Sequence, residues 1–490
     1  MRRPSAPCPA PSGTPSPWTA RTPATRPDVP DQSLPARSSP PGEPMRRTST
    51  AVAGRLLVAL LTLLVSGCGQ VPVRVTPNDF ALDGPPRGHL TILEKWADPE
   101  YAPYFQSAVR AYERRNPGVT IDLQAVGDQP YKDRIAVLAA SREMPDIYFT
   151  WPGRYARKFA DGKLAADLSE PLNGTAWGRT FEPGALNAFT FDGHRYGVPL
   201  DMDAKVFAYN KEIFAAAGVG RKPRTFPELL AACDRIAAAG HTPLAFGNQY
   251  GWPAGHLLTQ FNAMEVPPAV LARDYDGDGG DGAFTHPGYE RAFNDLAQLK
   301  KRCMGPSGTS MSHESAQNRL LYGKAAMQYL ETLEFSYLST KGGAPEKFAK
   351  NWDFFTMPAI PGAAGSARAV AGGADGLLVA NSSPNKALAV DFLKFLTSPD
   401  QARKVVRDLG WLSAVKGTAD AARLKGLSEA QRTLASKDMA LWLDTRADDK
   451  IVNPYLSAAE AVLGGRATAA QAVRQVREGA RQAHRFRVRD

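Results

Sequence analysis

Asp146-Ile147-Tyr148-Phe149 is a short apolar stretch that we expect to form the third strand of an alternating strand–helix series. Leu90–Leu93 and Val119–Val126 precede it as expected strands, with helices over Tyr104–Asn116 and Tyr131–Ser141 between them. Strands that alternate with helices of this length predict βαβ units and a parallel sheet with helices on both faces. The expected fold class is therefore α/β.

A second strand–helix series follows from Gly197 onward. The expected strands are Lys205–Asn210, Leu244–Phe246, Ala325–Leu330, Trp352–Met357 and Gly376–Ala380. The expected helices are Lys211–Ala217, Phe226–Ala239, Tyr289–Lys301, Glu314–Tyr322 and Lys386–Leu396, and the tail after Asp400 is helical and rich in Ala and Arg. A chain of 490 residues is long enough for two or three packed domains.

The first 44 residues have a composition that does not favour folding. They contain 13 of the 40 prolines and almost no large aliphatic residues, so they cannot bury enough surface to offset the entropy of ordering. We interpret residues 1–44 either as a disordered extension or as an upstream over-read, with Met45 as the true start.

A lipoprotein signal peptide is expected over residues 45–67. Met45-Arg46-Arg47 is followed by an apolar stretch and then by Val65-Ser66-Gly67-Cys68, which resembles the bacterial lipobox. This pattern predicts that Cys68 is acylated and anchors the chain to a membrane, with residues 68–87 as a tether. A plain secretory signal with an incidental cysteine is the alternative.

Charge and hydropathy exclude two broad classes of function. No apolar run reaches the roughly 18–20 residues of a bilayer-spanning helix, which excludes a polytopic membrane protein. Residues 1–67 carry +5 of the net charge of +10, so the remaining excess is modest and scattered. A nucleic-acid partner is therefore not expected.

Two cysteines remain after Cys8 and Cys68 are set aside. Cys233 lies on the apolar face of a predicted helix, where a buried free thiol fits, and Cys303 follows another helix. An exported domain also permits a disulfide between them, so both states stay open. Zinc-ligand spacing is absent from the sequence.

Four motifs together resemble the sugar-type extracellular solute-binding proteins of ABC importers, the maltodextrin-binding-like group. They are Met144–Phe149 with Trp151, Tyr196–Pro199 leading to Tyr209-Asn210-Lys211, Tyr322–Met327, and Ser383–Ala389 with Phe392–Leu396. In this order, behind a lipobox, they extend over most of residues 88–490.

The resemblance implies a two-lobed, type II periplasmic-binding-protein-like fold whose hinge is crossed more than once. The first lobe should combine residues 88–200 with 364–409, and the second 201–363 with 410–490. The implied function is delivery of a mono- or oligosaccharide to ABC permease subunits by closure of the lobes, without a cofactor. We expect a monomer, lipid-anchored on the extracellular face of the cytoplasmic membrane.

A sugar site needs aromatic surfaces for C–H faces and planar polar groups for hydroxyls. The candidates for ligand contact are Trp96, Trp151, Arg154, Asp201, Asp203, Trp252, Glu331, Asp375, Trp411 and Trp442. Trp151 and Asp203 are the leading ones, facing each other from opposite lobes.

The chain departs from the pattern of that group at one place. After Gly323-Lys324-Ala325-Ala326-Met327 the group usually has a Gly and then a stacking Trp, where this chain has Glu331 and Leu333. Glu331 could accept a hydroxyl or an amine instead. The departure leaves room for a smaller, more polar or cationic solute, such as an aminosugar.

An acidic loop gives a weak calcium candidate. Asp274, Asp276 and Asp278 alternate as in the first half of a calcium-binding loop, but Thr285 stands at the twelfth position instead of Glu. A solvated turn is the alternative, and no other metal site is expected.

Enzymatic and signalling functions are the remaining alternatives. Asp201 and Asp203 could be the carboxylate pair of a secreted glycoside hydrolase, but residues two apart seldom flank one bond. No nucleophile elbow or histidine cluster is present in the sequence, so an enzyme is not expected. A membrane-anchored sensory or scaffold binding lipoprotein is a further alternative.

Overall fold

The computed structural model describes residues 76–277, 279–305, 310–424, 426–434 and 436–487. The expected signal peptide, Cys68 and Asp278 lie outside the described residues. Among the described helices, none combines the length and the apolar composition that a membrane span requires.

The first sheet contains the strands expected at the start of the chain, and its strand order is β2-β1-β3-β12-β6. These strands are β1 (Arg87–Glu94), β2 (Gly118–Ala125), β3 (Ile147–Thr150), β6 (Gly197–Pro199) and β12 (Gly376–Val379). β1 is parallel to both β2 and β3, as βαβ units require. β12 is antiparallel to β3 and β6, so the sheet is mixed rather than parallel throughout. We call the elements packed around this sheet the first lobe.

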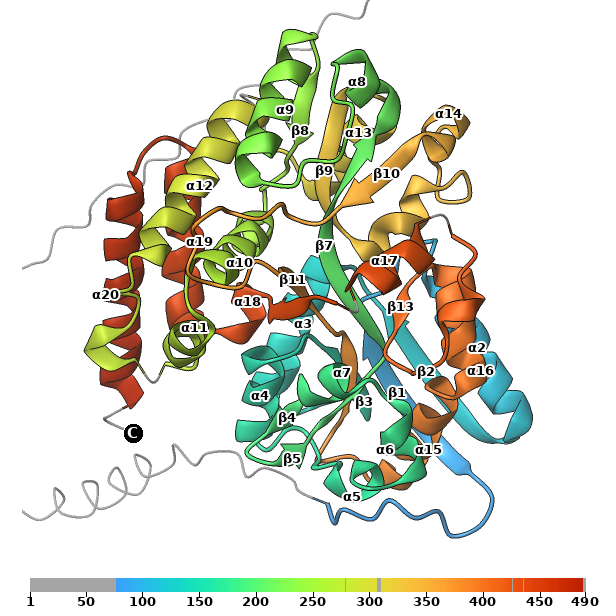
Figure 1. Ribbon diagram of the computed structural model, residues 1–490. Helices are drawn as coiled ribbons and strands as arrows, with labels where there is room; N and C mark the ends of the chain where they lie inside the picture. Colours follow the sequence, from blue (N-terminus) through green and yellow to red (C-terminus); the bar gives the residue numbers. More distant parts are fainter. Residues whose placement is uncertain (1–75, 278, 306–309, 425, 435, 488–490) are drawn as a thin grey trace, which may run out of the picture. The chain divides into compact units, whose positions relative to one another are not determined.

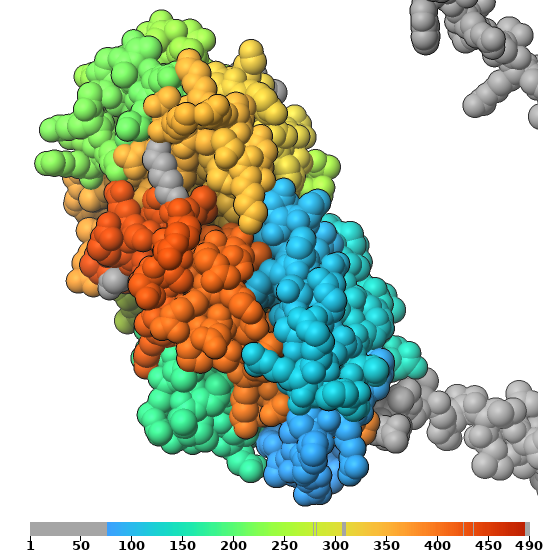
Figure 2. All heavy atoms as spheres, turned by 90° about the vertical axis from the view of Figure 1, so that its right-hand side faces the viewer, coloured from blue at the N-terminus to red at the C-terminus, as the bar shows by residue number. Residues whose placement is uncertain are grey.

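The helices of the first lobe are held by apolar residues at helical spacing. In α2 (Ala102–Arg115) the buried residues include Phe105, Val109 and Tyr112, which repeat every three to four positions. α2 ends at Arg115, because Pro117 disfavours helical backbone at Asn116, the residue before it. α3 (Asp128–Ser141) follows β2. α15 (Lys386–Leu396) packs against α2 and is followed by α16 (Pro399–Lys404), and Figure 2 shows this later segment beside the start of the first lobe.

The second sheet is organised around β7 (Asp201–Asn210), its longest strand. Its order is β14-β11-β7-β9-β8, and β10 and β13 also pair with β7. The other strands are β8 (Thr242–Ala245), β9 (Ala325–Glu331), β10 (Trp352–Phe355), β11 (Ala369–Gly373), β13 (Leu412–Ser413) and β14 (Asp438–Leu441). We call the elements packed around this sheet the second lobe (Figure 1).

Helices from the middle and the end of the chain cover the second sheet and share one hydrophobic core with it. They include α9 (Phe226–Ala238), α10 (Trp252–Glu265), α12 (Gly288–Cys303), α19 (Asp449–Leu463) and α20 (Ala469–Arg487), the last three side by side in Figure 1. The first lobe has a separate core that contains Trp96 and Trp411.

The remaining elements are short. They are the helices α4 (Arg154–Asp161), α5 (Ser169–Leu172), α6 (Ala176–Thr180), α7 (Pro183–Asn187), α8 (Lys211–Ala216), α11 (Pro268–Tyr275), α13 (His313–Leu321), α14 (Glu346–Lys350), α17 (Leu427–Leu434) and α18 (Leu443–Arg446), with the hairpin β4 (Thr190–Phe191) and β5 (His194–Arg195). Tighter or wider turns occur at Gly280–Gly282, Thr332–Leu338, Val405–Leu409 and Ala419–Ala421.

The chain passes between the two sheets three times within the described residues. It leaves the first sheet after β6 and enters β7, returns from β11 to β12, and crosses again before β13. β11 lies in the interval 364–409 that the sequence assigned to the first lobe, yet it pairs with β7 and β14 of the second sheet. Otherwise the lobe boundaries expected from the sequence stay predictions.

Two of the motifs that carry the family resemblance are joined by hydrogen bonds. The Asp146 carboxylate accepts hydrogen bonds from the backbone N–H and hydroxyl of Thr91 and from the Ser383 hydroxyl. The Asn385 amide donates to the His89 carbonyl at 2.9 Å. These bonds fasten β3 and the start of α15 to β1, so both motifs serve the fold of the first lobe.

Cys233 and Cys303 form a disulfide that joins α9 to the end of α12. The sequence left a free thiol and a disulfide open, and the structure shows the disulfide. It closes a loop in which the two cysteines are 70 residues apart.

Replacing both cysteines, as Cys233→Ala with Cys303→Ala, should lower the free energy of unfolding by about 2–4 kcal/mol, because the unfolded chain regains loop entropy. Urea unfolding of the double variant and the oxidised wild type measures the difference. Reduced wild type is the control and should match the variant. Equal midpoints for oxidised and reduced protein would contradict the prediction.

Candidate functional site

A small cavity between the two lobes collects aromatic and charged side chains from both. We call it the central pocket, and its volume is about 80 Å³. It is lined by Lys95, Asp128, Lys132, Trp151, Asp203, Trp252, His256, Glu331, Asp375, Trp442, Asp444 and Thr445.

The first lobe supplies its share of the pocket from the ends of its strands. Lys95 directly follows β1, Trp151 directly follows β3, and Asp375 lies between β11 and β12. Asp128 and Lys132 belong to the first turns of α3, which follows β2. Ligands of α/β sheets bind beyond the carboxyl ends of strands, and these residues occupy that place.

The second lobe closes the pocket from β7, β9, α10 and α18. Asp203 lies on β7 and Glu331 ends β9. Trp252 and His256 lie in the first turns of α10, and the segment Trp442–Thr445 begins α18.

Lysine ammonium groups lie over two of the three tryptophan rings of the pocket. The ammonium nitrogens of Lys95 and Lys132 are 5.0 and 4.8 Å from the ring centre of Trp151. That of Lys205, which is buried on β7, is 4.9 Å from the ring centre of Trp252. These distances are typical of cation–π contacts.

Each lobe pairs a lysine with a carboxylate inside the pocket. Lys95 lies 2.8 Å from Asp375, and Lys205 lies 3.2 Å from Glu331. Burial lowers the pKa of Lys95, but the carboxylates of Asp375 and Asp128 outweigh it and the pKa rises. Burial raises the pKa of Glu331, but Lys205 and His256 outweigh it and lower the pKa to about 2. Burial raises the pKa of Asp375 although Lys95 opposes the rise. Glu331 is therefore the one of these two carboxylates whose ionised form its surroundings favour.

Asp203 is anchored through one carboxylate oxygen. Oδ1 accepts hydrogen bonds from the Thr332 hydroxyl at 2.7 Å, the Ala204 N–H at 2.8 Å and the Leu333 N–H at 3.2 Å. Burial and the Glu331 carboxylate raise the pKa of Asp203 well above its usual range. The hydrogen bonds shown for this side chain all use Oδ1, so Oδ2 is the atom that can accept from a solute.

The structure brings together six of the ten sequence-predicted contact residues. Those that line the central pocket are Trp151, Asp203, Trp252, Glu331, Asp375 and Trp442. Asp201 is fully buried behind it, where its Oδ1 accepts the N–H of Asp375 at 2.9 Å. Asp201 therefore positions Asp375 and does not line the pocket.

Trp96 and Trp411 belong to the core of the first lobe. Trp96 turns back from the end of β1 and stacks on Phe105 with ring centres 4.7 Å apart. Trp411 is fully buried and its ring centre lies 5.5 Å from that of Trp96. The position after β1 that faces the pocket is Lys95, so the side chain of the next residue points away from it.

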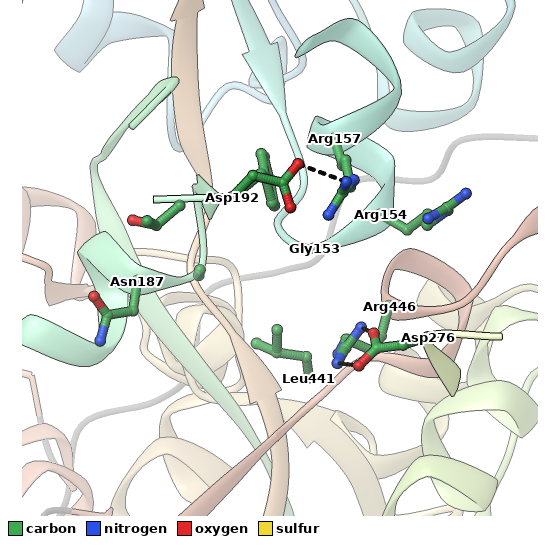
Figure 3. A pocket seen from close by; sticks show the side chains of 11 residues that line it. Gly153, Arg154, Arg157, Asn187, Asp192, Asp276, Leu441 and Arg446 are labelled. Carbon is green, nitrogen blue, oxygen red and sulfur yellow. Dashed lines mark hydrogen bonds and ion pairs between the residues drawn. The ribbon is translucent and has the colours of Figure 1, made fainter. Parts of the chain in front are cut away.

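Arg154 lines a second and larger cavity of about 560 Å³, which we call the arginine pocket. Figure 3 shows Arg157 paired with Asp192 of the first lobe and Arg446 with Asp276 of the second. Arg154 lies 3.4 Å from Asp448 of the second lobe. It is thus a contact between the lobes in this structure and does not line the central pocket.

Sequence reasoning missed six residues of the central pocket. They are Lys95, Asp128, Lys132, His256, Asp444 and Thr445. Lys95 and Asp128 each follow a predicted strand, so the rule that selected Trp151 could have found them. His256 and Asp444 sit within helical segments that carry no such signal.

Leu333 stands where the family pattern has a stacking tryptophan, and it does not line the central pocket. Its N–H donates to Asp203, and its carbonyl accepts from the Tyr101 hydroxyl at 3.5 Å. Trp252 and Trp442 provide the aromatic surface of the second lobe instead.

Within the described residues, the carboxylates of the calcium candidate are bonded to other groups of the protein. The buried Asp274 carboxylate accepts from the Phe284 N–H and the Tyr289 hydroxyl, and Asp276 is paired with Arg446. Within the described residues, no group of three or more His, Cys, Asp or Glu side chains could hold a metal ion.

Trp411→Ala should lower the free energy of unfolding by about 3–5 kcal/mol, because it empties a fully buried site in the core. Trp252→Ala, at a half-buried position on the pocket wall, should cost much less. Urea unfolding of both variants compares them. The core assignment of Trp411 would be wrong if its variant were the more stable of the two.

The sequence profile of the family described as bacterial extracellular solute-binding protein matches residues 97–403. A relative from Brucella abortus (strain 2308), named as a binding protein, is 26% identical over 330 residues, which cover 67% of this chain and 76% of the relative.

Solved structures share the fold. A chitin oligosaccharide binding protein superimposes with a TM-score of 0.72 at 22% identity, covering 81% of this chain and 99% of that one. A solute-binding protein of an ABC transporter from Thermotoga lettingae TMO, bound with α-D-tagatose, gives 0.68 at 20% identity over 81% and 99%. These likenesses confirm the predicted two-lobed, type II periplasmic-binding-protein-like fold. The family profile matches more than half of the length of this chain. The chain therefore belongs to the bacterial extracellular solute-binding proteins.

Proposed function

We propose that this protein binds a carbohydrate in the central pocket and delivers it to the permease subunits of an ABC importer. The observation that carries the proposal is the convergence of three tryptophans and five carboxylates from both lobes on one cavity. Indole rings suit the C–H faces of a sugar, and carboxylates accept its hydroxyl groups. Binding without chemical conversion is the role that this arrangement supports.

Closure of the lobes around the solute is part of the proposal. A solute that contacts Trp151 in the first lobe and Asp203 in the second favours the arrangement in which both touch it. Closure excludes water, which strengthens the hydrogen bonds made inside the pocket. The three crossing segments are the places where the backbone can bend.

A sugar panel tests the proposal. Thermal-shift screening with maltotriose, N,N′-diacetylchitobiose, D-galactose and D-tagatose, followed by calorimetry, should find at least one sugar that raises the melting temperature. Glucosamine oligosaccharides belong in the same panel, because Glu331 could accept an amine as well as a hydroxyl. A panel without any stabilising sugar would count against a carbohydrate solute.

Trp151→Ala and Asp203→Asn should each weaken sugar binding about ten- to hundredfold. The first removes a ring that faces the solute. The second keeps an oxygen that can accept from Thr332 but replaces Oδ2 with an amide nitrogen, which can only donate. Calorimetry with the best sugar of the panel measures both affinities.

Trp177→Ala is the matched control for the tryptophan variant. Trp177 lies in the first lobe, donates to the Thr397 hydroxyl and lines none of the pockets described above. Its variant should bind the sugar as the wild type does. Unchanged affinity of both the Trp151 and the Asp203 variants would contradict their assignment to the site.

Anchoring through Cys68 completes the proposal. The lipobox supports a lipid anchor on the extracellular face of the cytoplasmic membrane, where the protein can deliver the solute to the permease, and we expect it to be a monomer. Lipidation at Cys68 would place the binding protein beside the transporter without a spanning helix.

Cys68→Ala should release the protein from the membrane, because the acylated side chain is lost. Fractionation of cells that express the wild type or the variant, followed by immunoblotting of the membrane and soluble fractions, measures the distribution. Cys233→Ala is the control, since it removes a cysteine of the disulfide and should leave the protein in the membrane fraction. Equal retention of the Cys68 variant would contradict the anchor.

A further inference from the structure

His256 lies between two carboxylates inside the central pocket. Its ring stacks on Trp442, with ring centres 4.2 Å apart, and its side chain is only 7% exposed. Nε2 lies 3.4 Å from Oδ1 of Asp444, and Nδ1 lies 3.5 Å from Oε1 of Glu331. Nδ1 is buried and has no hydrogen-bond partner in the structure.

The neutral ring cannot satisfy both carboxylates, because a neutral imidazole carries a single N–H. One of the two ring nitrogens therefore has no hydrogen and faces a carboxylate oxygen. Both atoms are then hydrogen-bond acceptors. Protonation of the ring would supply the second N–H, but burial lowers the pKa of His256. The neutral ring is thus the form that occupies the pocket at neutral pH.

The single N–H belongs on Nε2, toward Asp444. Glu331 already has the ammonium group of Lys205 at 3.2 Å, so its need for a further donor is smaller. Oδ1 of Asp444 is buried and no donor of the described residues hydrogen-bonds to it, so it is the carboxylate oxygen with the greater need for the N–H. With the N–H on Nε2, Nδ1 and Oε1 of Glu331 are two acceptors that lie side by side.

We propose that Nδ1 of His256 and Oε1 of Glu331 together bind one hydrogen-bond donor of the solute, a hydroxyl or an ammonium group. A donor placed against both atoms removes the conflict between the two acceptors, and no donor of the described residues hydrogen-bonds to Nδ1. His256 then determines specificity, because the pair discriminates against a solute that lacks a donor at this position. The inference rests on the proposed function and adds that the pocket recognises a hydrogen-bond donor of the solute.

The same geometry makes solute binding depend on pH. The charged groups that face His256 are Glu331 on β9, Asp444 on α18 and Lys205 on β7. When His256 is protonated, its own Nδ1–H donates toward Glu331 and takes the place of the solute donor. Protonation and solute binding therefore compete, and affinity should fall as the pH falls.

The tautomer of His256 is tested first, without any solute. Nitrogen NMR of the full chain labelled with ¹⁵N-histidine, with the signal assigned by its loss in His256→Phe, reports which nitrogens carry protons at pH 7.5. A proton on Nε2 alone supports the proposal. A proton on Nδ1, alone or together with Nε2, overturns it.

Solute binding is tested next, by calorimetry with N,N′-diacetylchitobiose, maltotriose and a glucosamine disaccharide between pH 5 and pH 8. His256→Phe keeps an aromatic ring against Trp442 but removes the acceptor, so affinity should fall at least about tenfold at pH 7.5. The wild type should lose affinity as the pH falls, and the variant should show a flatter profile. Tighter binding of the glucosamine disaccharide than of the neutral sugars identifies an ammonium donor, and the reverse identifies a hydroxyl.

His313→Gln is the matched control. His313 is also buried and lies against Trp252, but its Nε2 is 2.7 Å from Glu334 and it does not line the central pocket. Its variant should keep the wild-type affinity and pH profile. A His256→Phe variant that binds as tightly as the wild type, with the same pH profile, overturns the proposal. Failure of every sugar to bind overturns the proposed function instead, and the tautomer measurement still decides the state of His256.

Discussion

The arrangement of the site depends on hydrogen bonds that join the three crossing segments to one another. The N–H of Leu200 donates to the carbonyl of Asp375 at 2.8 Å, and the N–H of Ala414 donates to the carbonyl of Leu200 at 3.2 Å. The Asp201 carboxylate accepts the N–H of Asp375 on the other side. Leu200 in the first crossing segment is thus hydrogen-bonded to both the second and the third crossing segments. Bending between the lobes must occur around these bonds, and Asp203 and Asp375 keep their places on either side of them.

Burial of Asp201 at this junction has an electrostatic consequence for the pocket. Burial and the nearby Asp375 raise the pKa of Asp201 well above its usual range, so its neutral form is favoured. A neutral Asp201 adds no further negative charge behind a pocket already lined by five carboxylates. The charges that remain are balanced locally, with Lys95 against Asp375 in the first lobe and Lys205 against Glu331 in the second. Each lobe therefore carries its own ion pair, and neither pair joins the lobes.

Much of the fold could be predicted because strands and helices alternate at regular lengths, and because elements such as α2 have clear apolar periodicity and end before Pro. The direction of β12 could not be predicted, since it depends on a return from the second sheet.

The site was predicted where a residue directly follows a strand, as Trp151 does. The same rule failed for Trp96, because successive side chains at the end of a strand point to opposite sides. Lys95 faces the pocket, and Trp96 therefore points away from it. Trp411 was a candidate on residue type alone, and tertiary packing placed it in the core. His256 gave no signal, since a histidine within an apolar helix looks the same whether it faces a core or a cavity.

The alternation along β7 explains why the substitution at Glu331 is compatible with a stable fold. Asp201, Asp203 and Lys205 are two residues apart, so their side chains lie on one face of the strand. In the pairing of β7 with β9, Lys205 stands opposite Glu331. A lysine that is only 1% exposed would be costly to bury without a carboxylate partner, and Glu331, which is 19% exposed, is the carboxylate that lies nearest to it. The buried lysine therefore requires the glutamate. A glycine at position 331, as in the family pattern, would leave Lys205 with Glu334 at 4.0 Å as its remaining ion pair in the structure. Glu331 thus adds a hydrogen-bonding group to the wall of the second lobe, while Trp252 and Trp442 keep that wall aromatic.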